Sequence, residues 1–281
     1  MERLNYRRNG IARSLKTQRT YTISLIVSDI SNPFFSTLVR GVEDALAEEG
    51  YSLIICNTDE NAEKERRYLN ISLEKGVDGA ILFPTGNKEE DIEQLIKKQH
   101  AFVFVDRITP GIAGDAVLSE NIKGAYQAVK HLLEWDHRRI GIIMGLESIS
   151  AIQERLKGYD QALRSFSLAR DAELIVNGSS KTQEGYEACL KLLDIADPPT
   201  AIFSTNNLMS QGVLRALKEK GLSYPKDVSV VGFDDFEEAA LYNPPLTVVS
   251  PKPYEMGFKA NTAHLVLYFY LCMRYLLSKK G

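Results

Sequence analysis

The segment Thr22-Ile-Ser-Leu-Ile-Val-Ser-Asp-Ile-Ser-Asn-Pro-Phe-Phe35 decides how the fold begins. Its first six residues form a short run rich in apolar and β-branched side chains, which is typical of a buried parallel strand. Asn32 is a favourable N-cap, and Pro33 suits a first helical turn because its missing N–H costs no hydrogen bond there. The segment therefore predicts a strand that leads directly into a helix.

The same pattern of a strand followed by a helix repeats along the chain in two series. The first series predicts strands at Thr22–Val27, Ser52–Asn57, Gly79–Phe83 and Phe102–Val105, with helices at Phe34–Glu49, Glu63–Lys75 and Lys88–Gln99. The second predicts strands at Ile140–Met144, Glu173–Val176, Ala201–Ser204 and Val228–Phe233, with helices at Ser150–Ser165, Thr182–Leu193 and Leu208–Lys220. Gly50 and Gly76 stand where a left-handed residue would end a helix. We expect an α/β protein with two doubly wound parallel-sheet lobes.

The distribution of charge separates the N-terminus from the rest of the chain. The first nineteen residues hold six Lys or Arg and one Glu, a net charge of +5, so the remainder carries −8 of the chain's total of −3. A short basic arm indicates contact with a polyanion. The arm has no apolar core of a signal peptide, and the three cysteines are far apart, so we expect a cytoplasmic protein without a disulfide framework. The apolar run Leu265–Leu277 is shorter than the roughly 20 apolar residues that a membrane-spanning helix needs.

Polar and aromatic residues follow the predicted strands of both series, where open parallel sheets bind their ligands. They are Phe34, Phe35, Asp106, Arg107, Arg155, Asn206 and Asp234. Taken singly, each has a structural alternative, such as a salt bridge between Asp106 and Arg107 or a helix cap at Asn206. Taken together, carboxylates, amides, guanidinium groups and aromatic rings suit a polyhydroxylated ligand.

Catalytic and metal-binding patterns are missing from the sequence. It contains no Gly-x-x-x-x-Gly-Lys-Ser/Thr loop, no His-Glu-x-x-His and no Gly-x-Ser-x-Gly. The four histidines are not spaced as metal ligands. We therefore expect no enzyme activity, no catalytic residues, no metal site and no cofactor.

An ordered set of short motifs resembles the LacI family of bacterial transcriptional regulators. The motifs are Asn32-Pro-Phe-Phe35, Val105-Asp-Arg107, Gln153-Glu-Arg-Leu-Lys-Gly-Tyr159, Asn206-Asn-Leu-Met209, Pro225-Lys-Asp-Val-Ser-Val230 and Val231-Gly-Phe-Asp234. The body also resembles periplasmic sugar-binding proteins, but Ile11-Ala-Arg-Ser-Leu-Lys16 resembles the family's hinge helix, which favours a regulator. The resemblance implies a hinge at residues 1–19, a first lobe at residues 20–120 plus 250–281, and a second lobe at residues 121–249.

The resemblance also implies roles for individual residues. The effector, a sugar or sugar acid, would contact Phe34, Phe35, Asp106, Arg107, Arg155, Asn206 and Asp234, with Asn121 as a further candidate. In a homodimer, Leu15 would enter the minor groove of operator DNA while Arg13 and Lys16 contact phosphates. Lobe closure on the effector would then shift the hinge helices and control repression.

The sequence departs from the family pattern at both ends. The family places a helix-turn-helix ahead of the hinge, and the sequence here starts near its last turn, so we expect weak DNA binding with little sequence preference from this chain alone. Pro251 stands where sugar-binding members often have Gln, and the run from Leu265 onward does not match the expected helix and strands, which suggests a truncated end. A cytoplasmic sugar-binding core or regulator remnant without specific DNA binding is the alternative function.

Overall fold

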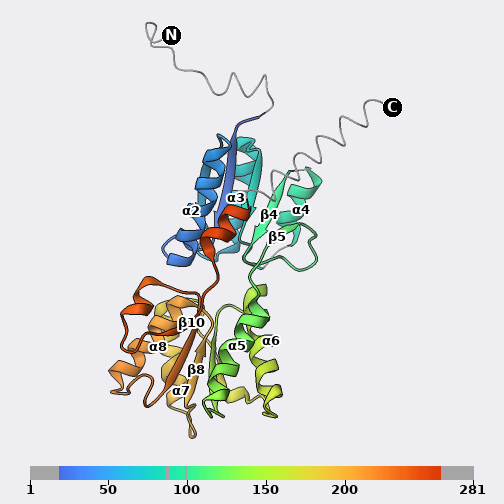
Figure 1. The fold of residues 1–281 in the computed structure, drawn as a ribbon. Helices are drawn as coiled ribbons and strands as arrows, with labels where there is room; N and C mark the ends of the chain where they lie inside the picture. Colours follow the sequence, from blue (N-terminus) through green and yellow to red (C-terminus); the bar gives the residue numbers. More distant parts are fainter. Residues whose placement is uncertain (1–18, 87–88, 99, 261–281) are drawn as a thin grey trace. The chain divides into compact units, whose positions relative to one another are not determined.

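Two parallel five-stranded sheets form the framework of the protein. The computed structural model describes residues 19–86, 89–98 and 100–260. The first sheet has the strand order β2-β1-β3-β4-β5 and the second β10-β9-β8-β6-β7, and every pairing in both is parallel. Both sheets are flanked by helices (Figure 1). The predicted α/β class with two doubly wound sheets is thus confirmed.

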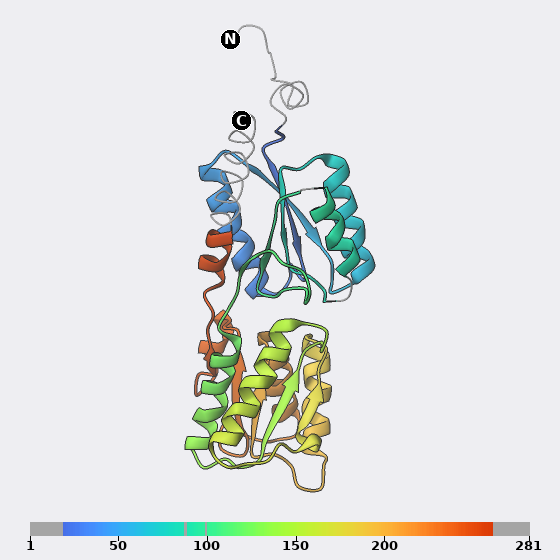
Figure 2. The same ribbon diagram turned by 90° about the vertical axis from the view of Figure 1, so that its right-hand side faces the viewer.

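The first sheet is built from the first series of predicted elements. Its strands are β1 (Thr22–Val27), β2 (Ser52–Asn57), β3 (Gly79–Leu82), β4 (Phe102–Val105) and β5 (Asp115–Val117), with helices α2 (Pro33–Glu48), α3 (Ala62–Lys75) and α4 (Glu89–Lys97). Ile26, Leu82 and Phe104 pack against Leu69 of α3 and Ile92 of α4. Figure 2 shows α3 and α4 together on one side of this sheet and α2 on the other. Gly50 and Gly76 have φ angles of 73° and 60°, which are the left-handed conformations predicted for these helix ends.

Residues 253–260 form a helical segment that groups with the first sheet. They lie beside α2 (Figure 1), and the Tyr254 hydroxyl donates a hydrogen bond to the Asp44 carboxylate of α2, with an O–O distance of 3.1 Å. The chain therefore returns to the first unit after completing the second.

The second sheet is covered on both faces by pairs of helices. Its strands are β6 (Ile140–Met144), β7 (Ile175–Asn177), β8 (Ala201–Ser204), β9 (Ser229–Phe233) and β10 (Thr247–Val249), and its helices are α5 (Asn121–Glu134), α6 (Ser150–Ser165), α7 (Thr182–Leu193) and α8 (Asn207–Glu219). Successive residues of β6 enter different cores: Ile142 packs in the α5 and α6 core, and Ile143 in the α7 and α8 core. This alternation explains the continuous apolar run of the strand.

Contacts between Cα atoms divide the chain into two units. Among the described residues, the first unit holds residues 19–30, 37–117 and 254–260, and the second holds Ser31–Ser36 and Leu118–Pro253. The N-terminal turn of α2 thus groups with the second unit. Asn32 and Asn207 explain this placement, because each side-chain amide donates to the other's oxygen, at 3.0 and 2.8 Å, and both residues are buried.

Among the described residues, besides two 3-10 helices and the helical segment at residues 253–260, three elements were missing from the sequence prediction, and the strands β7 and β9 begin later than expected. The missing elements are β5, α5 and β10. The strand expected from Glu173 begins at Ile175, because the Asp171 carboxylate accepts the Glu173 N–H at 3.0 Å and residues Ala172–Leu174 form a short 3-10 helix. Within the described part of the chain, no helix is long and apolar enough to cross a membrane, and no cluster of three or more His, Cys, Asp or Glu could hold a metal ion.

Candidate functional site

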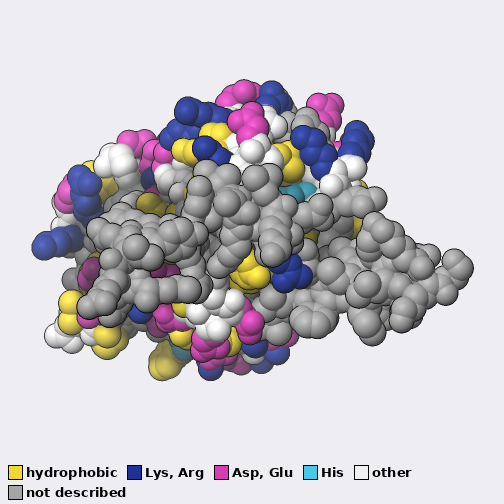
Figure 3. Space-filling view, turned by 90° about the horizontal axis from the view of Figure 1, so that it is seen from above, with side chains coloured by type: hydrophobic (Ala, Val, Ile, Leu, Met, Phe, Trp, Pro, Cys, Tyr) yellow, Lys and Arg dark blue, Asp and Glu magenta, His cyan; other side chains and the backbone are white. Residues whose placement is uncertain are grey.

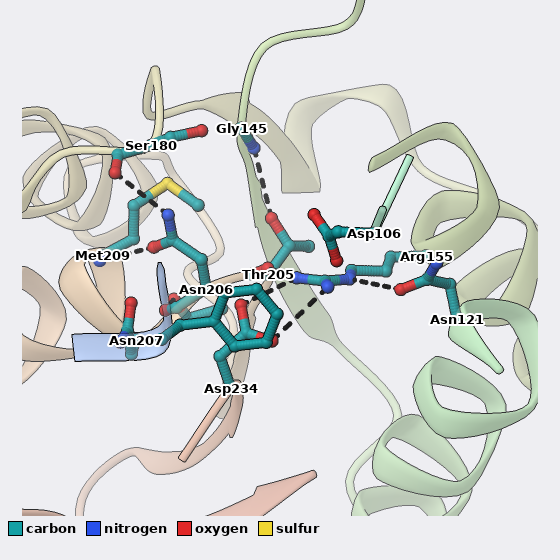
Figure 4. A network of polar contacts seen from close by, with 12 residues as sticks. Asp106, Asn121, Gly145, Arg155, Ser180, Thr205, Asn206, Asn207, Met209 and Asp234 are labelled. Carbon is teal, nitrogen blue, oxygen red and sulfur yellow. Dashed lines mark hydrogen bonds and ion pairs between the residues drawn. The ribbon is translucent and has the colours of Figure 1, made fainter. Parts of the chain in front are cut away.

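A buried ion pair lies at the ends of the strands in the second unit. Arg155 of α6 points to Asp234, which directly follows β9, and its two terminal nitrogens lie 3.1 and 3.4 Å from the carboxylate oxygens (Figure 4). Arg155 Nε donates to the Asn121 amide oxygen at 3.0 Å, and Nη1 also donates to the Thr205 carbonyl at 2.5 Å. The two side chains are 4% and 7% exposed. Four acceptor contacts therefore hold this guanidinium in place.

An aromatic ring completes the surroundings of Arg155. The guanidinium carbon lies 3.7 Å from the centroid of the Phe233 ring, which is close enough for a cation–π contact. A planar cation stacked on a ring and paired with a carboxylate has a fixed orientation. This arrangement can present a carboxylate and a guanidinium edge to the hydroxyl groups of a ligand.

The backbone at Asp234 is unusual. Its φ angle is 66°, in the left-handed region that Asp and Asn tolerate better than most residues. Its N–H donates to the Val249 carbonyl of β10 at 2.9 Å. The turn after β9 is thus tied to the neighbouring strand, which fixes the direction of the carboxylate.

The first unit holds a second arginine and aspartate at the end of β4. Arg107 donates two hydrogen bonds to the Glu60 carboxylate, at 2.8 and 3.0 Å, and one to the Ser28 hydroxyl at 2.8 Å. Its Nε lies 3.6 Å from an Asp106 carboxylate oxygen. Burial lowers the pKa of the Arg107 guanidinium, but pairing with Glu60 outweighs it, and the pKa is raised above its ordinary value. Arg107 therefore remains charged while 3% exposed.

Glu65 of α3 adds a further buried carboxylate near Arg107. One of its oxygens accepts the Thr85 backbone N–H at 2.6 Å. Burial raises the pKa of Glu65, and the hydrogen bond from Thr85 and the charge of Arg107 only partly offset that effect. The first unit thus surrounds one guanidinium with several carboxylates.

The remaining predicted residues have structural roles in the second unit. Phe34 and Phe35 are buried, and their rings meet edge to face with centroids 5.2 Å apart. The Asn206 amide oxygen accepts the Met209 N–H at 2.7 Å, which makes Asn206 the N-cap of α8, and its amide nitrogen donates to the Ser180 carbonyl at 2.9 Å (Figure 4). Asn121 also donates to Glu154 at 3.0 Å. The structure therefore joins Asn121, Arg155 and Asp234 in one network and Asp106 with Arg107 in another.

A family comparison covers most of the chain. The family model described as "Periplasmic binding proteins and sugar binding domain of LacI family" matches residues 20–265. This chain belongs to the LacI family. The resemblance inferred from the motifs is thereby confirmed.

Curated relatives and solved structures place the chain among transcriptional regulators. It is 36% identical over 260 residues to the probable HTH-type transcriptional regulator EndR of Paenibacillus polymyxa, covering 92% of this chain and 76% of EndR. A structure of the transcriptional regulator CelR in complex with cellobiose is 30% identical, with a TM-score of 0.82, over 91% of this chain and 82% of CelR. A LacI family regulator from Enterococcus faecium with bound ribose is 31% identical, with a TM-score of 0.76, over 87% of this chain and 89% of that protein.

These relatives define what this LacI-family chain carries. It contains the effector-sensing domain of a transcriptional regulator, and the regulators that it matches are not enzymes. Operator DNA and small-molecule effectors are partners of the family. The predicted absence of catalytic function is confirmed by this family membership.

Sequence reasoning missed several residues that shape the two networks. Glu60 and Ser28 fix Arg107, and Thr205 accepts from Arg155. Ser28 and Thr205 directly follow β1 and β8, so the strand-end rule could have found them. Glu60 had no such signal, because it lies three residues beyond β2 in a turn without glycine.

The three residues predicted to contact DNA, Arg13, Leu15 and Lys16, lie outside the described residues. The described part of the face in Figure 3 carries Lys and Arg side chains interspersed with Asp and Glu. Such a mixed surface carries no prediction of DNA contact by itself.

Proposed function

We propose that this chain is the sensing part of a LacI-family repressor of the bacterial cytoplasm, and that it binds a sugar or sugar acid. The observation that carries the proposal is the pairing of an aspartate and an arginine at the strand ends of each unit, Asp234 with Arg155 and Asp106 with Arg107. Carboxylates accept hydrogen bonds from sugar hydroxyls, and guanidinium groups donate to them. Cellobiose and ribose in the structures of CelR and the Enterococcus faecium regulator support a sugar as the ligand.

The remaining predicted residues complete the proposed effector contacts. Phe34 and Phe35 would offer aromatic surface to the C–H face of a sugar ring, while Asn121 and Asn206 would orient the charged groups and supply amide contacts. The effector would favour one of two conformations of a homodimer and thereby change its affinity for operator DNA. Arg13, Leu15 and Lys16 would make the hinge contacts with that DNA.

Ligand-dependent stabilisation tests the effector half of the proposal. A thermal-shift screen over sugars and sugar acids should find compounds that stabilise the chain, by about 2.7 kcal/mol at a hundredfold excess over the dissociation constant. Asp234→Asn should lose most of that response. Arg215→Met, which alters an exposed arginine on α8, should respond like the wild type. A panel without any stabilising compound, or an unchanged response in Asp234→Asn, would contradict the proposal.

Operator binding tests the other half. We expect residues 1–281 to bind DNA weakly. A version with a helix-turn-helix ahead of residue 1 should bind an operator specifically, and the effector should change the affinity of that version for the operator. Leu15→Ala should weaken that specific binding. If the extended version binds no operator, the alternative of a sugar-binding core without a DNA role is favoured; if the short version binds with equal specificity, the expected role of the added domain is wrong.

A further inference from the structure

The guanidinium of Arg107 is already occupied by a carboxylate of the protein. Its two terminal nitrogens donate to the two oxygens of Glu60, at 2.8 and 3.0 Å, and the second also donates to Ser28. This two-point geometry is the one by which an arginine recognises the carboxylate or phosphate of a ligand. An anionic ligand would therefore have to displace Glu60.

The turn that carries Glu60 is built to hold it in this position. Asp59 and Glu60 both have left-handed backbones, with φ angles of 54° and 58°, although neither is a glycine. Asn57 donates to Asp59 at 2.7 Å, Lys64 pairs with Asp59, and Asn61 caps α3 by accepting the N–H groups of Glu63 and Lys64. Two consecutive residues in a sparsely populated conformation persist only where the surroundings enforce it, and such strain is common at functional sites.

The charges around Arg107 leave no unpaired cation there for an anionic effector. Arg107 faces Glu60 and Asp106, so one positive charge stands against two negative charges, a net charge of −1 before Glu65 is counted. These three side chains are at most 11% exposed. An added anion would meet repulsion and desolvation in these surroundings, whereas a neutral polyol can donate hydrogen bonds to the carboxylates.

We infer that the effector is an uncharged sugar, and that Glu60 selects against sugar acids and sugar phosphates by occupying Arg107. This inference rests on the proposed function and narrows its ligand class. Glu60 is a positioning residue, because it acts through Arg107.

Calorimetric titration of the 281-residue chain with matched pairs of compounds tests the inference. The pairs are D-glucose and D-glucuronate, and D-galactose and D-galacturonate, in which the acid keeps the pyranose ring of the sugar. Any sugar that binds the wild type should bind at least about tenfold more tightly than its acid. Glu60→Gln should reduce that ratio by about tenfold or more, because Arg107 then lacks a charged partner at its terminal nitrogens. Glu60→Asp, which keeps the charge, should preserve the preference for the sugar.

Glu63→Gln is the matched control. It removes the same charge from an exposed position on α3, where the Glu63 side chain is 73% exposed, so the ratio should stay at the wild-type value. An acid that binds the wild type as tightly as its sugar overturns the inference, and this measurement does not depend on the folding of any variant. An unchanged ratio in folded Glu60→Gln also overturns it. Failure of every sugar and every acid to bind would instead contradict the proposed function on which the inference rests.

Discussion

The two units place an aspartate in the same backbone position. Asp106 follows β4 and Asp234 follows β9, and both have a φ angle of 66°. Each N–H donates to the last residue of the neighbouring edge strand, Asp106 to Val117 and Asp234 to Val249, with both N–O distances 2.9 Å. The backbone that presents the carboxylate is therefore repeated.

The arginines beside these aspartates are held in different ways. Arg155 comes from a helix, pairs with Asp234 itself and stacks on Phe233. Arg107 is the next residue after Asp106, and it makes its two-point contact with Glu60 instead. A repeated scaffold thus carries two different charge arrangements. In the second unit, the charges of Arg155 and Asp234 balance. In the first unit, the carboxylates around Arg107 outnumber the cations.

The largest expected effect comes from removing the arginine of the balanced pair. Arg155→Met leaves Asp234 without its ion-pair partner in a buried site, so we expect the free energy of unfolding to fall by about 3–5 kcal/mol. Trp135, the chain's single tryptophan, lies in the second unit. Its side chain is 72% exposed and already hydrated, so urea denaturation is followed by circular dichroism, which measures the loss of helix.

Arg215→Met controls for the loss of a guanidinium. Arg215 also pairs with a carboxylate, Glu219, and stacks on Tyr186 at 4.6 Å, but its side chain is 51% exposed. Exposed pairs contribute little, so the expected loss is within about 1 kcal/mol. Equal losses in the two variants would show that burial of the Arg155 pair is not what stabilises it.

Replacing each of the two aspartates by asparagine should lower the free energy of unfolding by different amounts, both smaller than the loss in Arg155→Met. Asn tolerates the left-handed backbone and nearly matches Asp in size, so Asp234→Asn and Asp106→Asn change the charge alone. Asp234→Asn deprives Arg155 of its carboxylate, with an expected loss of about 1.5–3 kcal/mol. In Asp106→Asn, Arg107 keeps both hydrogen bonds to Glu60, and its 3.6 Å approach to Asp106 is longer than a hydrogen bond, so the loss should be smaller, below about 1.5 kcal/mol. Paired unfolding curves measure the difference, and a larger loss in Asp106→Asn would reverse our interpretation of the two units.

Long periodic segments made most of the fold predictable. The strands β1, β2, β4, β6 and β8 and the helices α6 and α7 have the predicted bounds, because each is an apolar or amphipathic run with a clear period. The strands β5 and β10 have three residues each, and none of these residues is fully buried. Their sequences therefore carry little apolar signal. They form because pairing with β4 and β9 satisfies their backbone groups.

The candidate site was predictable only where its residues follow strands. That rule, with the family resemblance, found Asp106, Arg107, Arg155 and Asp234, and effector binding by these residues stays a prediction. Glu60 was not predictable, because its contact with Arg107 joins positions 47 residues apart. The contact also depends on a left-handed turn that contains no glycine from which it could be predicted. The charge arrangement that distinguishes the units therefore came from tertiary contacts.

The smallest expected effect concerns pH and the carboxylate excess of the first unit. The pKa of Glu65 is raised in the folded state above its ordinary value of 4.5, mainly by burial, so the folded chain holds this proton more tightly than the unfolded chain. The stabilisation is complete below the ordinary value and is lost as pH rises through the folded pKa. Glu65→Gln keeps an oxygen for the Thr85 N–H and removes the titration. Its free energy of unfolding should therefore rise relative to the wild type between about pH 4.5 and pH 7.5, measured by urea denaturation. The exposed variant Glu63→Gln should show no such relative rise; if it does, the pH dependence does not come from the buried carboxylate of the first unit.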